Sequence, residues 1–269
     1  MPALSEDTLI RCPECRGALS LGSNDGYECT GGHRFDVHEG VLDLVPADLR
    51  DETWTIWEEH LAAFQRRREE RVDKPETLTA RMTSRNNQQA AFVDFIDAAG
   101  STWLDIGCGP GKFSQTVPSS VRYVGIDPIP LLPDVLQIEF ARAVSERMPF
   151  EDAAFSDVVI LHAIDHVKDV PASLAEIIRI LQPGGRLHIL QNVIEKSRPL
   201  RYMAHELKDF LEDRRDAGRN EDTPHHMTEF SADSLDTAVR AAGFSIKETA
   251  YWSPNLIAPR RLMLTAQRS

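Results

Sequence analysis

The sequence lacks long hydrophobic runs and has few basic residues for its length. None of its apolar stretches approaches the roughly 20 residues that a membrane-spanning helix needs. The first residues mix Glu6, Asp7 and Arg11 with apolar positions, so we expect no signal peptide, no membrane segment and a cytoplasmic location. The chain has 30 lysine and arginine residues against 42 aspartate and glutamate residues, which gives a formal net charge of −12. Such a chain repels a polyanion unless it gathers a local basic patch, so these charges favour a small-molecule partner over nucleic acid.

Cysteine is also scarce, and three of the four cysteines lie within the first 30 residues. Cys12 and Cys15 are separated by two residues, and Cys29 is closely followed by His33. Two such pairs on facing turns complete the tetrahedron that zinc prefers, with no coordination position left open for catalysis. A cysteine-rich loop without a metal is the alternative, but we expect these four residues to bind a structural Zn²⁺.

The residues around this cluster predict a zinc ribbon over residues 1–48. Residues 19–21 and 27–28 flank a polar turn that contains Asp25 and Gly26, a pattern typical of a β-hairpin. A unit this small buries too little surface to be stable alone, and a bound metal supplies the missing stability. The segment has three basic residues against nine acidic ones, so it is poorly suited to bind RNA.

Residues 49–99 predict a helical connector or cap. Apolar residues recur at helical spacing over residues 54–64, and residues 90–96 form a second apolar helical stretch. We interpret the charged residues 65–71 as a solvated helix face, with a phosphate-contacting patch as the alternative. The second helix would pack on the edge of a sheet, where it could cover a cofactor.

The most informative stretch runs from Thr102 to Phe113 and reads TWLDIGCGPGKF. Its apolar residues predict a buried parallel strand, and the glycines that follow let the backbone turn sharply and approach a ligand closely. A helix that begins near Lys112 would present free N–H groups beside that ligand. Asp105, inside the strand, suits a cationic amino group better than a pyrophosphate, which argues against a dehydrogenase.

Later segments predict the rest of an α/β sheet. Residues 122–127 predict a second strand that ends in Asp127, which is placed to accept hydrogen bonds from both ribose hydroxyls of a nucleoside. The further predicted elements are a strand over 155–162, a helix over 173–181, a strand over 186–190, a helix that begins near Ser231 and ends at Gly243, and closing strands near 246–252 and 261–266.

Together these stretches resemble the class I S-adenosylmethionine-dependent methyltransferase superfamily. The matching segments are LDIGCGPG, YVGID, ERMPFEDAAFSDVVILHAIDHV and LAEIIRILQPGGRLHIL, in the expected order over about residues 100–192. The resemblance implies an α/β fold with a Rossmann-like seven-stranded sheet, helices on both faces and one reversed strand, over residues 100–269. It also implies S-adenosyl-L-methionine as the cofactor. The cofactor-binding residues that it implies are Asp105, Gly107, Cys108, Gly109, Gly111, Asp127, Ser145, Glu146 and His162.

The N-terminal ribbon resembles that of bacterial guanine-N1 methyltransferases that act on large-subunit rRNA. The likeness extends past the cysteines to the segments HRFD at residues 33–36 and EGVL at residues 39–42. This resemblance supports a nucleic-acid substrate, whereas the acidic composition opposes it.

One segment departs from the superfamily. The space between Asp127 and Pro149 is short and contains Pro128, Pro130 and Pro133, where family members fit a full helix and the third strand. Proline fixes φ and removes a hydrogen-bond donor, so we expect a degraded or absent helix over residues 128–140 and a partly remodelled adenine pocket.

Residues 193–230 are expected to form a lid over the methyl acceptor. Methyl transfer is an in-line displacement at a sulfonium carbon, so the enzyme mainly has to align the acceptor and exclude water. A hydroxyl acceptor also benefits from a base, and histidine has a suitable pKa. Each candidate also has a structural interpretation, such as packing or capping the lid. The candidate catalytic bases are His162, His166, His225 and His226.

We therefore expect a methyltransferase that acts on an oxygen or nitrogen of a small-molecule acceptor, such as a specialised metabolite or a sugar. An rRNA or tRNA base methyltransferase is the first alternative. A non-catalytic scaffold that keeps the cofactor pocket is the second, and the intact glycine loop with Asp127 argues against it.

Overall fold

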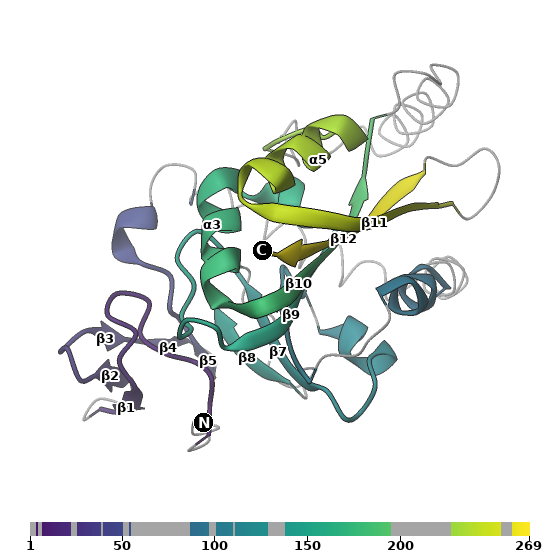
Figure 1. Cartoon of the computed structure of the whole chain (residues 1–269). Coiled ribbons are helices and arrows are strands. Elements are labelled where there is room, and N and C mark those ends of the chain that lie inside the picture. The colour runs from purple at the N-terminus through teal and green to yellow at the C-terminus, as the bar shows by residue number, and fades with distance from the viewer. Residues whose placement is uncertain are drawn as a thin grey trace, which may run out of the picture.

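A seven-stranded sheet forms the centre of the molecule (Figure 1). The order of its strands is β11-β12-β10-β9-β6-β7-β8. β12 runs antiparallel to both of its neighbours, and all the other neighbouring strands are parallel, which confirms the predicted sheet with one reversed strand. The strands are β6 (Thr102–Ile106), β7 (Arg122–Asp127), β8 (Glu139–Arg142), β9 (Phe155–Leu161), β10 (Leu181–Asn192), β11 (Phe244–Trp252) and β12 (Arg261–Arg268).

The structure is a computed structural model, and it describes most of residues 1–50 and most of the central sheet. The described residues are 4, 7–22, 26–38, 40–50, 54, 87–96, 101–109, 111–128, 138–194, 227–253 and 260–269. Most of the predicted connector and lid therefore lies outside the described residues, as does the expected break of the helix over 129–137. Among the described helices, none is long and apolar enough to cross a membrane.

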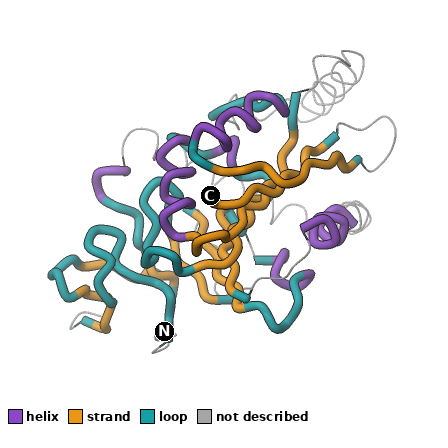
Figure 2. The backbone as a smooth tube through the Cα atoms, in the orientation of Figure 1, coloured by secondary structure: helices purple, strands orange, loops and turns teal. Residues whose placement is uncertain are grey.

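Helices cover both faces of the sheet (Figure 2). Successive side chains of a strand point to opposite faces, so Leu104 and Trp103 belong to different hydrophobic clusters. α3 (Val170–Ile180) and α5 (Ala232–Ala241) pack on the face that Leu104 shares. The helix over residues 87–96 packs on the opposite face and buries Phe92 and Ile96 against Trp103. This helix confirms the second helical stretch predicted in the connector, but it packs on a face of the sheet and not on its edge, because its apolar residues meet those of the inner strands β6, β9 and β10.

Side-chain caps explain where the two long helices begin. The Asp169 carboxylate accepts a hydrogen bond from the backbone N–H of Ala172, 2.9 Å away, at the start of α3. Ser231 and Ser234 form a capping box at the start of α5. Each contact satisfies an N–H group that has no partner within the helix, which stabilises the first turn.

Two boundaries differ from the sequence prediction. The helix expected near Lys112 is a 3-10 helix of five residues, η2 (Lys112–Thr116), and it ends before Val117 and Pro118. β10 begins at Leu181 and not at Arg186, with a shift of register between these two residues, where Pro183 has no N–H to donate and Gly184 has a φ of 75°. The third strand, β8, is present despite the prolines that precede it.

The N-terminal unit consists of two small antiparallel sheets. The predicted hairpin is confirmed as β1 (Leu19–Leu21) paired with β2 (Tyr27–Cys29), and β3 (Arg34–Phe35) adds a third strand. β4 (Val37–His38) pairs with β5 (Val41–Leu42), and the 3-10 helix η1 (Ala47–Leu49) follows.

The N-terminal unit packs directly against the β8 edge of the central sheet (Figure 1). Asp43 forms a parallel bridge with Arg142 of β8, and Leu44 N–H donates to the Arg142 carbonyl at 2.8 Å. Ile10 forms an antiparallel bridge with Phe150. These contacts cover backbone groups of an edge strand that would otherwise remain exposed.

Candidate functional site

The glycine loop that follows β6 makes the sharp turn that the sequence predicts. Gly107, Gly109 and Gly111 have φ values of 70°, 53° and 65°, in the left-handed region that favours glycine. A Cβ atom on Gly107 would lie 2.4 Å from the Cβ of Ala163, so the loop touches the segment after β9. A Cβ on Gly109 would meet no atom within 4 Å, so open space adjoins the loop at this glycine.

Asp127, at the end of β7, holds this loop. The buried Asp127 carboxylate accepts a hydrogen bond of 2.9 Å from the Gly109 N–H through Oδ2. The N–H groups of Gly107 and Cys108 donate to the Ile126 carbonyl at 2.8 and 3.2 Å. The structure thus brings the predicted ribose-binding carboxylate directly against the predicted glycine loop.

The position of the loop in the sheet is that of a ligand site. β6 lies between β9 and β7. The chain adds β7 and then β8 on one side of β6, and it then returns to add β9 and β10 on the other side. In open α/β sheets, ligands bind outside the carboxyl ends of the strands at such a reversal of strand order. The predicted residues Gly107 and His162 follow β6 and β9 at this point.

Asp105 is buried, and it accepts a hydrogen bond from the Tyr123 hydroxyl through Oδ2. Burial, followed by the nearby charge of Asp105, raises the pKa of the Tyr123 hydroxyl well above its ordinary value, so the hydroxyl keeps its proton. Tyr123 is not among the site residues predicted from the sequence. The strand register pairs it with Trp103, two residues before Asp105, and so places its hydroxyl beside the Asp105 carboxylate.

Cys108 contributes to the loop through its backbone and not through thiolate chemistry. Its side chain packs on β7, because a Cβ on Gly125 would lie 2.7 Å from the Cys108 sulfur. Burial, and then the charges of Asp105 and Asp127, hold the pKa of the Cys108 thiol well above its usual range. The thiol is therefore protonated near neutral pH and is a poor nucleophile.

His162 adopts an unusual backbone conformation, with a φ of 54°. Its N–H donates to the Leu190 carbonyl at 2.8 Å. Its Nε2 lies 2.7 Å from Nε2 of Gln88, on the helix over residues 87–96. The side-chain amide of Gln88 is thus hydrogen-bonded to this ring nitrogen. The contact occupies the nitrogen that a general base at Nε2 would use.

Gln88 is also absent from the predicted site residues. It lies in a segment whose only sequence signal is apolar periodicity, yet its side chain is only 4% exposed. Buried polar side chains of this kind are hydrogen-bonded, and here the partner is a predicted site residue.

Ser145 and Glu146 follow β8 in a turn. The Ser145 hydroxyl donates to Glu146 Oε2 at 3.4 Å, and Glu146 Oε1 accepts from the N–H groups of Lys168 and Asp169 at 3.0 and 3.3 Å. Glu146 thus ties this turn to the segment that leads into α3. A contact of these two residues with a cofactor stays a prediction.

The remaining candidate bases are only partly described. His166 ends the short 3-10 helix η4 (Ile164–His166), with its side chain 33% exposed and Nε2 3.8 Å from Asp165 Oδ1. His225 and His226 lie outside the described residues. The end of the predicted lid is docked nearby, because the Asp165 carbonyl accepts from the N–H groups of Met227 and Thr228 at 2.7 and 3.1 Å.

The four predicted metal ligands converge. One ligand atom from each of Cys12, Cys15, Cys29 and His33 lies within 4.8 Å of the others. His33 Nδ1 is 3.2 Å from the Cys29 sulfur and 3.6 Å from the Cys12 sulfur. Burial raises the pKa of Cys29, but hydrogen bonds from His33 outweigh it and bring that pKa to about 6. Three thiols and one imidazole in this arrangement fit a tetrahedral zinc ion.

A buried histidine that the sequence analysis did not select lies inside the sheet. His188 of β10 is 3.0 Å from Asp157 Oδ1 through Nε2 and 2.9 Å from the Thr265 hydroxyl through Nδ1. Both His188 and Asp157 are almost fully buried, and Asp157 lies near the amino end of β9, away from the glycine loop. This pair is therefore a buried polar contact inside the sheet, apart from the glycine loop.

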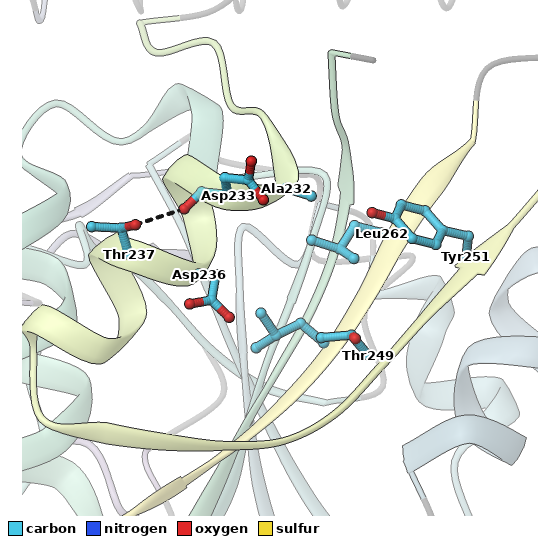
Figure 3. A pocket seen from close by; sticks show the side chains of 8 residues that line it. Ala232, Asp233, Asp236, Thr237, Thr249, Tyr251 and Leu262 are labelled. Atoms are coloured by element: carbon cyan, nitrogen blue, oxygen red, sulfur yellow. Dashed lines mark hydrogen bonds between the residues drawn. The ribbon is translucent and has the colours of Figure 1, made fainter. Parts of the chain in front are cut away.

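A cavity of about 380 Å³ lies between α5 and the two closing strands (Figure 3). It occupies the β11 edge of the sheet, opposite β8. None of its lining residues is a predicted cofactor, metal or catalytic residue, so this cavity is distinct from the glycine loop. The lining residues are Ala232, Asp233, Asp236, Thr237, Thr249, Tyr251, Leu262 and Leu264.

Comparison with known families identifies the class of protein. A family model described as a methyltransferase domain matches residues 64–249, which is more than half of the 269 residues. The chain therefore belongs to this methyltransferase family.

Curated relatives match a shorter segment. An uncharacterized methyltransferase of Mycobacterium tuberculosis is 33% identical over 103 residues, which cover 36% of this chain and 42% of the relative. A ubiquinone/menaquinone biosynthesis C-methyltransferase of a Marinomonas species is 34% identical and covers 35% and 43%. An O-methyltransferase of Aspergillus nomiae is 29% identical and covers 48% and 61%. The match thus spans less than two thirds of each relative's length.

Solved structures share the fold at low identity. A methyltransferase of Thermotoga maritima, described as a possible histamine N-methyltransferase, has a TM-score of 0.54 at 18% identity and covers 80% of this chain and 99% of that chain. The 1,6-didemethyltoxoflavin-N1-methyltransferase of Burkholderia thailandensis, solved with S-adenosylhomocysteine, has a TM-score of 0.53 at 16% identity and covers 79% and 90%. At these identities the likeness establishes the fold and leaves the substrate open.

Proposed function

We propose that the protein is an S-adenosylmethionine-dependent methyltransferase that acts on a small-molecule acceptor. The observation that carries this proposal is the contact between Asp127 and the N–H of Gly109, at the reversal of strand order. A loop of positive-φ glycines held by a buried carboxylate at that point suits a nucleoside ligand.

Each residue around the loop has a distinct role in this proposal. The backbone at Gly107 and Gly109 approaches the ligand, because a side chain at Gly109 would fill the open space there. Asp127 uses Oδ2 for the loop, and its carboxylate has further capacity to accept from ribose hydroxyls. Asp105 provides negative charge for the amino group of the cofactor, oriented by the Tyr123 hydroxyl.

The cofactor supplies an electrophilic methyl group on a sulfonium, and this chain aligns the acceptor and excludes water. Because Gln88 occupies Nε2 of His162, we assign His162 a positioning role. His166, His225 and His226 remain the proposed bases for an acceptor that must lose a proton.

The net charge of the chain and the names of its relatives support a small-molecule acceptor. A net charge of −12 opposes binding to a polyanion. The relatives include proteins named as an O-methyltransferase and as a quinone-biosynthesis C-methyltransferase. We propose an oxygen or nitrogen of a specialised metabolite or sugar as the acceptor.

We also propose that Cys12, Cys15, Cys29 and His33 bind one structural Zn²⁺. The arrangement of three thiols and an imidazole around a common centre supports this assignment. Four protein ligands leave no open position, so the ion would stabilise the N-terminal unit and take no part in methyl transfer.

Calorimetric titration with S-adenosylhomocysteine tests the enzyme class. We expect micromolar binding to the wild type and a loss of about 1–3 kcal/mol for Asp127→Ala, which removes a buried acceptor. The matched control is Asp236→Ala, which removes a carboxylate of α5 that lines the cavity at the β11 edge and should bind as the wild type does. Absence of wild-type binding would favour the scaffold hypothesis.

A further inference from the structure

The N-terminal unit places one buried carboxylate between two arginines. Asp43 is 3% exposed, and its Oδ2 lies 2.9 Å from Arg142 on β8. Its Oδ1 lies 2.7 Å from Arg50 and accepts from the Val45 N–H at 3.1 Å. Burial of a charge is costly unless it is paired and hydrogen-bonded, so these contacts fix the orientation of Asp43.

Arg142 connects this carboxylate to the end of β7. Its Nη1 contacts Asp43, and its Nε donates to the carbonyl of Pro128 at 2.9 Å. The Trp54 ring stacks on the guanidinium, with the carbon of the guanidinium 4.7 Å from the ring centroid. The planar guanidinium is therefore held from two sides while it reaches the residue that follows Asp127.

The hydrogen bond from Arg142 matters for the backbone after Asp127 because the next residue is a proline. Pro128 has no N–H, so its backbone can be anchored only through its carbonyl. Within the sheet, Asp127 pairs with Arg142, and the Ala143 N–H donates to the Asp127 carbonyl at 3.3 Å. The Arg142 side chain adds the anchor for the next carbonyl.

We propose that Asp43 and Arg142 are positioning residues that hold the Asp127–Pro128 segment in the conformation that binds the cofactor, so the N-terminal unit sets cofactor affinity. This inference rests on the proposed function, because it takes Asp127 as a cofactor ligand. The unit acts through Arg142 and touches neither the cofactor nor the acceptor.

Titration with S-adenosylhomocysteine tests this assignment. Arg142→Lys keeps a positive charge beside Asp43 but loses the fork that spans Asp43 and Pro128. We expect its dissociation constant to rise about tenfold, the effect of one lost hydrogen bond to a charged group. Asp43→Asn should weaken binding in the same direction, and near-UV circular dichroism should verify that both variants are folded.

A double-mutant cycle separates positioning from general loss of structure. If Arg142 acts through Asp127, Arg142→Lys should cost much less affinity in an Asp127→Ala background than in the wild type. The matched control is Glu151→Gln, which removes an ion pair of 2.9 Å with Arg11 between the same two units and should leave affinity unchanged.

Three outcomes are decisive. A wild type that does not bind S-adenosylhomocysteine would overturn the proposed function and this inference together. If the wild type binds S-adenosylhomocysteine and Arg142→Lys has the same dissociation constant as Glu151→Gln, the inference is overturned and the proposed function stands. Equal losses for Arg142→Lys in the two backgrounds would also overturn it, because the residue would then act independently of Asp127.

Discussion

The N-terminal unit and the central sheet meet at β8 but hold their shape by different means. The sheet has strands of up to twelve residues and apolar clusters on both faces. The N-terminal unit has strands of two or three residues, and its buried Tyr27, Leu42 and Leu44 belong to the same cluster as the sheet residues. The unit therefore has no separate apolar core among its described residues. We therefore expect its stability to depend on the proposed zinc site and on the sheet on which it packs.

This difference gives the two units different sensitivities. Apolar burial in the sheet is spread over many side chains, whereas the N-terminal unit has four proposed zinc ligands. We therefore expect the sheet to tolerate the loss of one contact better than the N-terminal unit tolerates the loss of one ligand. The contact between the units includes a buried ion pair, that of Asp43 and Arg142. Such a pair is sensitive to removal of one partner.

The largest expected effect is that of the metal. Cys15→Ser should abolish zinc binding, and residues 12–38 should lose protection from hydrogen exchange while the sheet strands keep theirs. Structural zinc contributes on the order of 10–16 kcal/mol in small domains, far more than the apolar contacts of this unit. Metal analysis and hydrogen-exchange mass spectrometry measure the two effects. Cys108→Ala is the matched control and should retain one zinc per chain. A wild type purified without zinc would refute the prediction.

The next largest effect is expected at the junction. Asp43→Ala leaves Arg142 buried without its carboxylate, and we expect the free energy of unfolding to fall by about 3–5 kcal/mol. Urea denaturation measures this change. Replacing both partners, as Asp43→Leu with Arg142→Met, should recover part of the loss because no buried charge remains. A loss below about 1 kcal/mol for Asp43→Ala would mean that the junction is held by its apolar contacts.

A smaller, pH-dependent effect is expected inside the sheet. Burial lowers the pKa of His188 below its ordinary value, although Asp157 opposes this shift. The unfolded chain therefore binds a proton on this histidine below about pH 6.5, where the folded chain does not, and stability falls as the pH drops. The slope that one such group contributes is at most about 1.4 kcal/mol per pH unit.

His188→Gln should flatten this profile between pH 7 and pH 5, as measured by urea denaturation at each pH. His38→Gln is the control, because His38 lies exposed on β4. Equal slopes for the wild type and His188→Gln would show that acid acts elsewhere in the molecule.

The sequence predicted most of the elements that carry strong local patterns. Local sequence patterns indicate apolar strands, glycine turns and closely spaced metal ligands. The sheet with its reversed strand, the glycine turn and the convergence of the four proposed ligands could therefore be predicted from the sequence. The contacts of Gln88 with His162, Tyr123 with Asp105 and Asp43 with Arg142 join residues that are distant in sequence. No periodicity or motif encodes such pairs, because they arise only when the sheet register and the packing of the units are known.

The smallest expected effect tests whether burial, and not charge alone, makes the Asp43–Arg142 pair important. Arg11 and Glu151 also join the N-terminal unit to the sheet domain at 2.9 Å, but the Glu151 side chain is 61% exposed. Water and salt screen such a pair, so Glu151→Gln should lower the free energy of unfolding by about 0.2–1 kcal/mol, and the loss should shrink at high salt. Urea denaturation at low and high ionic strength measures it. A loss as large as that of Asp43→Ala would mean that the number of ion pairs, and not their desolvation, sets the strength of the junction.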